Sequence, residues 1–196
     1  MRVSIMVEQR IVVLIGSASD LPFAHRIEDF LKKEHFQVKL EYKISSAHRN
    51  PEKLIADLSA YEKSRDEIVY ITMAGLSDAL SGIVAGYVTN PVIACPPDLT
   101  AYEWGKVFSS AFMPKGVPVM LVPEPENAAL AAVKILAAAN HELKSALEKY
   151  RGRMREAVTK ADAEMRRKQA HELEREHVER IDHLEHGEHG EHRENE

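Results

Sequence analysis

Short apolar runs alternate with segments of helical spacing from residue 11 to about residue 140, and this alternation restricts the fold more than any other feature of the chain. Five runs are either wholly apolar or alternate apolar with polar residues, as strands do, whereas the segments between them repeat apolar residues every three or four positions. The sequence therefore predicts strands over residues 11–15, 38–44, 68–73, 92–95 and 117–122. It predicts helices over residues 20–36, 50–61, 80–88, 102–112 and 127–139.

Strands that alternate with helices form a parallel sheet, because each helix carries the chain back across the sheet in a right-handed crossover. The run over residues 11–15 is wholly apolar, as a central strand covered on both faces must be. The run over residues 38–44 alternates, which suits a strand nearer an edge. We predict an α/β fold: a three-layer, doubly wound, parallel five-stranded sheet in the flavodoxin-like order 2-1-3-4-5, in preference to a Rossmann order, with a C-terminal helical extension.

The composition changes at His141, where Lys, Arg and Glu fill the positions around a sparse apolar stripe. We predict three segments: an α/β domain over residues 1–140, a helical extension over 141–170 and a charged, His-rich, disordered tail over 171–196. The extension is either a long helix that packs on a neighbouring subunit or a solvated, fraying one. Six tail histidines could bind a transition metal, although a flexible segment without fixed geometry favours incidental affinity over a functional site. They are His171, His177, His183, His186, His189 and His192.

Charge and cysteine content exclude several classes of protein. The net charge of -5 at pH 7 offers no basic field to a nucleic acid or an anionic membrane. No apolar run approaches the roughly 18 residues that a membrane span needs, and the first ten residues lack the apolar core of a signal peptide. The single cysteine, Cys95, cannot form an internal disulfide and is most simply a strand-end residue. We expect a soluble, cytoplasmic protein without nucleic-acid or membrane partners.

Three loops follow the first three predicted strands, at the edge where an open parallel sheet binds its ligands. They cover residues 16–20, 45–51 and 74–82, and the order 2-1-3 places them side by side. All three are rich in small residues that form hydrogen bonds. Together they predict one binding pocket.

The first loop suits a phosphate or a sugar. Gly16 permits a tight turn, Ser17 and Ser19 offer hydroxyls, and the helix that follows presents free N–H groups and the positive end of its dipole. Asp20 would repel a phosphate, so it suits ribose hydroxyls better. The alternative is that Ser19 and Asp20 only cap the helix.

The second loop has the residues of an anion site next to a proton-transfer group. Arg49 is a permanent cation whose planar fork matches a phosphate, and Ser46 adds a hydroxyl. His48 lies beside them on a loop, where a histidine is placed for proton transfer. By contrast, His25 and His35 fall on or at the end of a predicted helix and are most simply surface residues.

The third loop offers geometry rather than reactive groups. Asp78 is its only acid, base or nucleophile, while Gly75 and Gly82 let backbone N–H groups approach a carboxylate closely. Ala79 and Leu80 would keep such a pocket apolar and dry. A plain strand-to-helix turn explains the same residues equally well.

Taken in order and spacing, these loops resemble the catalytic-subunit family of phosphoribosylaminoimidazole carboxylase, which includes the N-carboxyaminoimidazole ribonucleotide mutases. The similarity covers about residues 11–136, and although each motif is short, the set in register is specific. The motifs that carry it are Gly-Ser-x-Ser-Asp at 16–20, Ser-Ala-His-Arg at 46–49, Met-Pro-x-Gly-Val-Pro at 113–118 and Asn-Ala-Ala at 127–129.

The third loop separates two classes of this family. The mutase class typically reads Ala-Gly-Gly-Ala-Ala-His-Leu-Pro-Gly, whereas the class that uses carbon dioxide directly reads Ala-Gly-Arg-Ser-Asn-Ala-Leu-Ser-Gly, followed by a strand that ends in Cys-Pro-Pro. This chain resembles the direct carboxylases, since Ala79 stands where mutases have histidine and residues 95–97 read Cys-Pro-Pro. Two residues depart from that class: Leu76 replaces the arginine and Asp78 the asparagine. We expect both changes to make the loop more negative where a carboxylate should form.

The resemblance implies that carbon dioxide is joined to C4 of 5-aminoimidazole ribonucleotide, giving 4-carboxy-5-aminoimidazole ribonucleotide in purine (IMP) biosynthesis without a metal or other cofactor. His48 is implied to be catalytic and to move the C4 proton. Serine hydroxyls and Arg49 would bind the 5′-phosphate, Asp20 the ribose, and backbone N–H groups of the third loop the new carboxylate. The residues implied to bind substrate are Ser17, Ser19, Asp20, Ser46, Arg49, Gly75, Ser77, Ala79 and Leu80.

Three alternatives to direct carboxylation stay open. The chain could be an N-carboxyaminoimidazole ribonucleotide mutase, or a related carboxylase that acts on another heteroaromatic ring. It could also be a non-enzymatic, flavodoxin-like nucleotide-binding module, for which Tyr102 and Trp104 are the available loop aromatics. The resemblance further implies a homo-tetramer or homo-octamer.

Overall fold

The structure is a computed structural model that describes residues 7–97 and 105–187, with side chains of the last helix described as far as His177. The chain divides into two compact units, Met1–Leu147 and Glu148–Glu196. Among the described helices, none is both long and apolar enough to cross a membrane.

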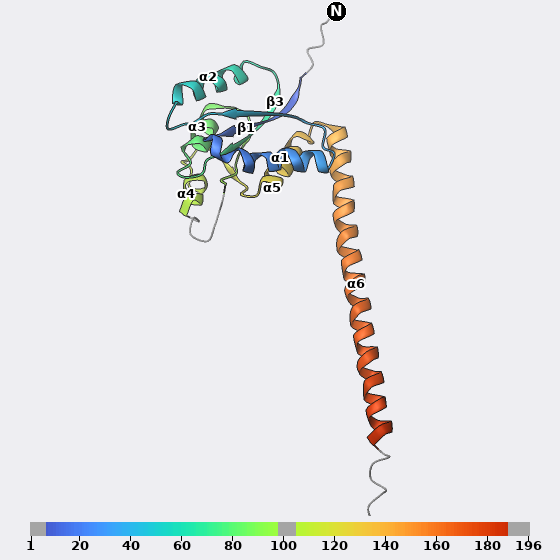
Figure 1. Ribbon diagram of the computed structural model, residues 1–196. Helices are drawn as coiled ribbons and strands as arrows, with labels where there is room; N and C mark the ends of the chain where they lie inside the picture. Colours follow the sequence, from blue (N-terminus) through green and yellow to red (C-terminus); the bar gives the residue numbers. More distant parts are fainter. Residues whose placement is uncertain (1–6, 98–104, 188–196) are drawn as a thin grey trace, which may run out of the picture. The chain divides into compact units, whose positions relative to one another are not determined.

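The first unit contains one sheet of five parallel strands in the order β2-β1-β3-β4-β5 (Figure 1). This confirms the predicted flavodoxin-like order. β1 lies inside the sheet and residues 11–15 are fully buried, as their wholly apolar sequence requires. The strands are β1 (Gln9–Ile15), β2 (Lys39–Ile44), β3 (Glu67–Met73), β4 (Val92–Ala94) and β5 (Met120–Leu121).

Helices cover both faces of this sheet. α1 and α5 pack against each other on one face, and the residues of α2 and α3 share a buried cluster with β1 and β3 on the other. Val12 and Leu14 of β1, for example, lie in one core with Leu54, Leu58 and Val84. The helices are η1 (Ala18–Asp20), α1 (Leu21–Lys33), α2 (Pro51–Glu62), α3 (Ala79–Tyr87), α4 (Gly105–Ala111), α5 (Pro125–Leu136) and α6 (His141–Gly187).

β5 and α1 are shorter than the sequence predicts, each for an identifiable reason. β5 has only two residues instead of the predicted 117–122, because Pro118 has no N–H to donate to the ladder and Gly116 turns the chain with φ 94°. α1 ends at Lys33 rather than near Phe36, because His35 takes a left-handed φ of 61°. Residues 102–104 of the fourth predicted helix, which include Tyr102 and Trp104, lie outside the described residues.

The last helix is longer than the sequence predicts. Leu143 and Leu147 are buried in the first unit, whereas α6 continues to Gly187, past the predicted end at residue 170. No glycine or proline interrupts residues 153–186, and pairs such as Arg166 and Asp162, 3.0 Å apart, add support along one face. Residues 188–196 of the predicted tail lie outside the described residues, and the division into three segments stays a prediction.

The tail histidines form no metal centre among the side chains that the structure describes. No group of three or more His, Cys, Asp or Glu side chains could hold a metal ion there. His171 and His177 are exposed, and His171 Nδ1 lies 3.6 Å from a carboxylate oxygen of Glu174. The side chains of the other four tail histidines lie outside the described residues.

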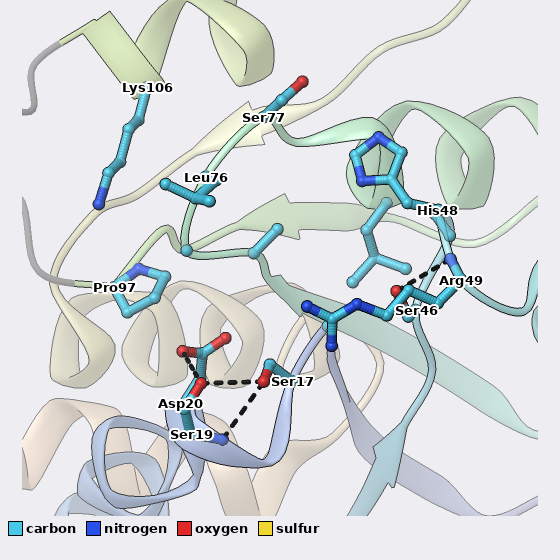
Figure 2. Close-up of a pocket in the computed structure, with 15 residues that line it drawn as sticks. Ser17, Ser19, Asp20, Ser46, His48, Arg49, Leu76, Ser77, Pro97 and Lys106 are labelled. Carbon is cyan, nitrogen blue, oxygen red and sulfur yellow. Dashed lines mark hydrogen bonds between the residues drawn. The ribbon is translucent and has the colours of Figure 1, made fainter.

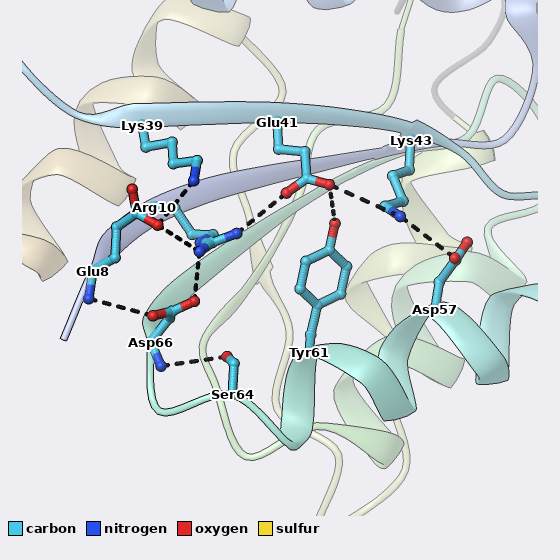
Figure 3. Close-up of polar contacts among 9 residues, drawn as sticks. All are labelled: Glu8, Arg10, Lys39, Glu41, Lys43, Asp57, Tyr61, Ser64 and Asp66. Carbon is cyan, nitrogen blue, oxygen red and sulfur yellow. Dashed lines mark hydrogen bonds and ion pairs between the residues drawn. The ribbon is translucent and has the colours of Figure 1, made fainter. Parts of the chain in front are cut away.

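A cluster of charged side chains fixes the edge strand β2 against β1 and α2 (Figure 3). Arg10 of β1 lies at its centre, with Nη2 2.6 Å from Glu8 and 2.5 Å from Asp66. Its Nη1 lies 3.4 Å from Glu41 of β2, which also accepts a 2.7 Å hydrogen bond from the hydroxyl of Tyr61 on α2. Because β2 leads directly into the second loop, these contacts determine where that loop begins.

Candidate active site

Backbone hydrogen bonds join the three predicted loops at the carboxyl ends of β1, β2 and β3. Ser45 N donates to Ile15 O and Gly16 N donates to Met73 O, each at 2.8 Å. The Gly16 backbone runs so close to β3 that an added Cβ would lie 3.3 Å from Met73 O, so a larger residue would push the two loops apart. The three loops therefore form one rim.

The rim encloses a cavity of about 340 Å³, which is the size of a small-molecule site. Residues from all three loops contribute to it, and two further segments complete the wall. The lining residues are Gly16, Ser17, Ser19, Asp20, Ser46, Ala47, His48, Arg49, Ala74, Gly75, Leu76, Ser77, Leu80, Pro97 and Lys106.

The first loop presents its hydroxyls and carboxylate as one hydrogen-bonded group. Ser17 caps η1 and its Oγ lies 2.9 Å from Ser19 Oγ, which in turn lies 3.2 Å from Asp20 Oδ1. Asp20 stands at the N-cap position of α1 but its side chain makes no capping hydrogen bond. Instead, its carboxylate faces the third loop, since a Cβ at Gly75 would lie 3.5 Å from Asp20 Oδ1. Capping therefore does not explain Asp20, and its carboxylate is available to a ligand.

The second loop holds a cation without a partner. Ser46 closes a turn: its carbonyl accepts from Asn50 N at 3.0 Å and its Oγ accepts from Arg49 N at 3.3 Å. Within the described part of the chain, the guanidinium of Arg49 has no hydrogen bond or ion pair. Figure 2 shows it extending toward Ser17, with His48 on the side of Ser77. A guanidinium next to serine hydroxyls has the hydrogen-bond donors that can bind a phosphate.

The third loop turns its acid away from the cavity. Asp78 is 5% exposed and caps α3: Oδ1 accepts from Ser81 N at 2.9 Å, and Oδ2 accepts from the hydroxyls of Ser81 and of Ser110, the latter at 2.6 Å. Asp78 is not a lining residue. The carboxylate of Asp78 is therefore directed at α3 and α4 rather than into the cavity, and the expected effect of its charge on the reacting end stays a prediction. Leu76, by contrast, lines the cavity and is 75% exposed.

A family model described as AIR carboxylase matches residues 10–157, which include the whole rim. The chain belongs to the AIR carboxylase family. It is 39% identical over 155 residues to the phosphoribosylaminoimidazole carboxylase of Archaeoglobus fulgidus, covering 79% of this chain and 84% of the relative. It is 37% identical over 158 residues to the N5-carboxyaminoimidazole ribonucleotide mutase of Methanocaldococcus jannaschii, covering 80% and 97%.

A solved structure of the family matches the fold as well. The crystal structure of Treponema denticola PurE superposes with a TM-score of 0.76 at 34% sequence identity, and the match covers 80% of this chain and 98% of that chain. The chain is therefore an enzyme of the AIR carboxylase family, and its relatives include proteins named as carboxylases and one named as a mutase.

Nine of the ten site residues predicted for this family member line the cavity, namely Ser17, Ser19, Asp20, Ser46, His48, Arg49, Gly75, Ser77 and Leu80. The tenth, Ala79, begins α3 but does not line the cavity.

Sequence reasoning missed Lys106 and Pro97, which come from the chain after β4. The available signal was topological: β4 is parallel to β3, so the segment that follows it also leaves at this rim.

Proposed function

We propose that this chain carboxylates C4 of 5-aminoimidazole ribonucleotide with carbon dioxide, as a step of purine biosynthesis. The observation that carries the proposal is the guanidinium of Arg49, which has no partner in the described ranges 7–97 and 105–187 and shares one cavity with the serine hydroxyls of the first loop and with His48. This arrangement offers an anion site and a proton acceptor within the span of one small molecule. The names of the relatives support the reaction.

The ribonucleotide would bind through its two polar ends. Arg49 forms two hydrogen bonds to the 5′-phosphate, while Ser46 and Ser17 donate their hydroxyl protons, with Ser19 beside them. Asp20 accepts hydrogen bonds from the ribose hydroxyls. Since carbon dioxide itself offers little binding energy, the phosphate anchor supplies most of the positioning.

The reaction needs one bond made and one proton removed. The enamine carbon C4 attacks carbon dioxide, a C–C bond forms, and an electron pair of the C=O bond moves to oxygen to give a carboxylate. The ring then carries a proton on C4, and an imidazole nitrogen of His48 takes it, so that the ring becomes aromatic again. Backbone N–H groups between Gly75 and Leu80 would hold the carboxylate.

The third loop favours direct carboxylation over the mutase reaction. No histidine occurs in residues 74–82, and Ala79 occupies the position of the mutase histidine. A second proton-transfer group, which moving a carboxyl from nitrogen to carbon would use, is therefore missing from this wall. A relative named as a mutase keeps the alternative open to experiment.

One assay tests the proposal. Purified protein is given either 5-aminoimidazole ribonucleotide with bicarbonate or the N-carboxylated ribonucleotide, and formation of the 4-carboxylated product is followed. We expect conversion of the first pair. Conversion of the N-carboxylated compound alone would make the chain a mutase, and conversion of neither would leave a carboxylase for another heteroaromatic ring or a binding module.

We further propose that the chain acts in the cytoplasm as a homo-tetramer or homo-octamer, as its family resemblance implies. Phe108 on α4 and Phe112 directly after it support assembly, since they are 58% and 77% exposed and their rings stack with 5.4 Å between centroids. Light scattering on purified protein gives the number of subunits, and a monomer would contradict this part of the proposal.

A further inference from the structure

We infer that Lys106 is a substrate-binding residue that holds the carboxylate formed at C4. This inference rests on the proposed function and adds a residue to the same site. Its basis is the distribution of charge around the cavity and a set of hydrogen bonds that ties Lys106 to the third loop.

The cavity has two cations and the product has two anionic groups. Among the lining residues that the structure describes, the permanently charged side chains are Arg49, Asp20 and Lys106. Arg49 and the serines account for the phosphate, and Asp20 accounts for the ribose. Lys106 is the second cation among the described lining residues and is the one we assign to the carboxylate, whose charge develops during the reaction.

Lys106 lies on the side of the cavity where the third loop runs. Figure 2 shows its side chain reaching down from α4 along the wall that Leu76 and Pro97 form, away from Ser46 and Arg49. Leu76 supplies no charge, and Pro97 is buried.

Hydrogen bonds fix Lys106 relative to the third loop. Ser109 Oγ donates to Lys106 O at 2.7 Å and accepts from Asp78 N at 3.0 Å, so one hydroxyl joins the start of α4 to the loop backbone. One residue later, Ser110 Oγ donates to Asp78 Oδ2 at 2.6 Å. The backbone of Lys106 therefore moves with Asp78, and Asp78 caps the helix that follows the carboxylate-binding loop.

In this arrangement Asp78 has a structural role and Lys106 a role in binding the carboxylate. The carboxylate of Asp78 accepts hydrogen bonds from α3 and α4 and does not line the cavity. Asp20 therefore supplies the only carboxylate among the described lining residues. The same contacts hold α4 where Lys106 reaches the cavity. A cation placed in advance stabilises the developing carboxylate more than the neutral gas, so it lowers the barrier as well as binding the product.

The test compares affinities for two ligands that differ only in the carboxylate. Isothermal titration gives the Kd of 5-aminoimidazole ribonucleotide and of its 4-carboxylated form for the wild type, Lys106→Ala and Lys106→Arg. We expect Lys106→Ala to weaken binding of the carboxylated ligand about tenfold or more, as loss of a charge-assisted hydrogen bond does, and binding of the other less than about twofold. Lys106→Arg should keep most of the affinity.

Two further variants separate a direct contact from a change of shape. Lys115→Ala removes an exposed lysine that does not line the cavity and should change neither Kd. Leu76→Arg in the Lys106→Ala background returns a cation to the same wall and should recover affinity for the carboxylated ligand to within about threefold. If Lys106→Ala weakens the affinity for both ligands equally, or for neither, the role of Lys106 is overturned while the proposed function stands. Wild-type protein that binds neither ribonucleotide overturns both.

Discussion

The hydroxyl of Ser110 on α4 donates a 2.6 Å hydrogen bond to Oδ2 of Asp78 in the third loop, and both residues are almost fully buried. The same carboxylate accepts from Ser81 N and Ser81 Oγ, and Ser81 Oγ lies 2.7 Å from Thr72 Oγ1 on β3. A continuous group of polar atoms therefore runs from β3 through the third loop to α4. It converts an acid that the sequence places at the reaction site into a structural anchor for that site.

We predict that Asp78→Ala lowers the free energy of unfolding by about 2–4 kcal/mol, because it removes a helix cap and leaves buried donors without an acceptor. Asp78→Asn keeps an acceptor for Ser81 N and should cost less than about half as much. Urea denaturation followed by circular dichroism gives the values. Asp29→Ala, on the exposed side of α1, is the control and should change stability by less than about 0.5 kcal/mol. A similarly small effect of Asp78→Ala would contradict the anchoring role.

Much of the fold could be predicted because apolar periodicity reports local burial directly. The wholly apolar run at residues 11–15 identifies the central strand, and the alternation at 38–44 an edge strand, which together give the order of the first three strands. β5 and the end of α6 could not be placed in the same way. The length of β5 depends on which N–H groups reach β4, and α6 continues through residues whose helical state depends on the absence of breakers rather than on an apolar stripe.

We predict that His48→Asn abolishes carboxylation and leaves ribonucleotide binding within about threefold of the wild type. Asparagine fills a similar volume but cannot accept and release the C4 proton, and general acid–base groups typically contribute about 10²–10⁴-fold in rate. Steady-state assays give kcat, and titration with 5-aminoimidazole ribonucleotide gives Kd. His25→Asn, on the exposed part of α1, should leave both unchanged. Turnover by His48→Asn at a near wild-type rate would rule out the proton-transfer role.

We predict that Arg49→Ala acts mainly on binding and raises KM for the ribonucleotide about tenfold or more. The guanidinium has no hydrogen bond or ion pair among the residues that the structure describes, so its removal should leave the thermal midpoint nearly unchanged. Arg49→Lys keeps the charge but cannot form two parallel hydrogen bonds to one phosphate. Its KM should therefore lie between those of the wild type and Arg49→Ala. Steady-state kinetics and thermal denaturation of the three proteins provide the comparison. An unchanged KM would contradict the phosphate assignment.

Only the site residues that directly follow a predicted strand could be placed from the sequence. Ser17, Ser46 and Gly75 follow strands whose order the sequence gives, so their neighbourhood follows from the topology. The orientation of Asp78 depends on Ser110, which is 32 residues away in sequence, and no local pattern contains that contact. Lys106 likewise enters the cavity only because α4 returns to the rim. Long-range packing decides both, and for this reason neither the direction of the Asp78 carboxylate nor the place of Lys106 could be predicted.

We predict that Cys95 is inert toward thiol reagents in the folded protein. It is fully buried, its Sγ donates to Pro123 O at 3.3 Å, and burial, together with the charge of Glu124, raises the pKa of the thiol well above its ordinary value. Because only the thiolate reacts, native protein at pH 8 should be labelled at least about 100-fold more slowly than protein in guanidinium chloride. Labelling with a chromogenic disulfide gives both rates. Equal rates would show that the strand end is accessible and that Cys95 is more than a core residue.

We predict that Asp57 makes stability depend on pH on the acid side. Burial alone would raise the pKa of Asp57, but the hydrogen bond from Lys53 at 2.6 Å and the charges of Lys43 and Lys53 lower it overall. A carboxyl whose pKa is lower in the folded than in the unfolded state stabilises the fold above the unfolded pKa, and this contribution disappears as the pH falls through the folded one.

The test compares the wild type with Asp57→Asn by urea denaturation. The wild type should be the more stable near pH 6, and the difference should shrink between about pH 5 and pH 3, since an unfolded aspartate titrates near pH 3.9. Ser45, the buried first residue of the second loop, also donates to Asp57, at 3.2 Å. Acid that weakens this contact should therefore loosen the start of the loop that carries His48 and Arg49, and ribonucleotide affinity should fall with the stability difference. A difference in stability that stays constant over this range would show that Asp57 contributes no ionic stabilisation to the second loop.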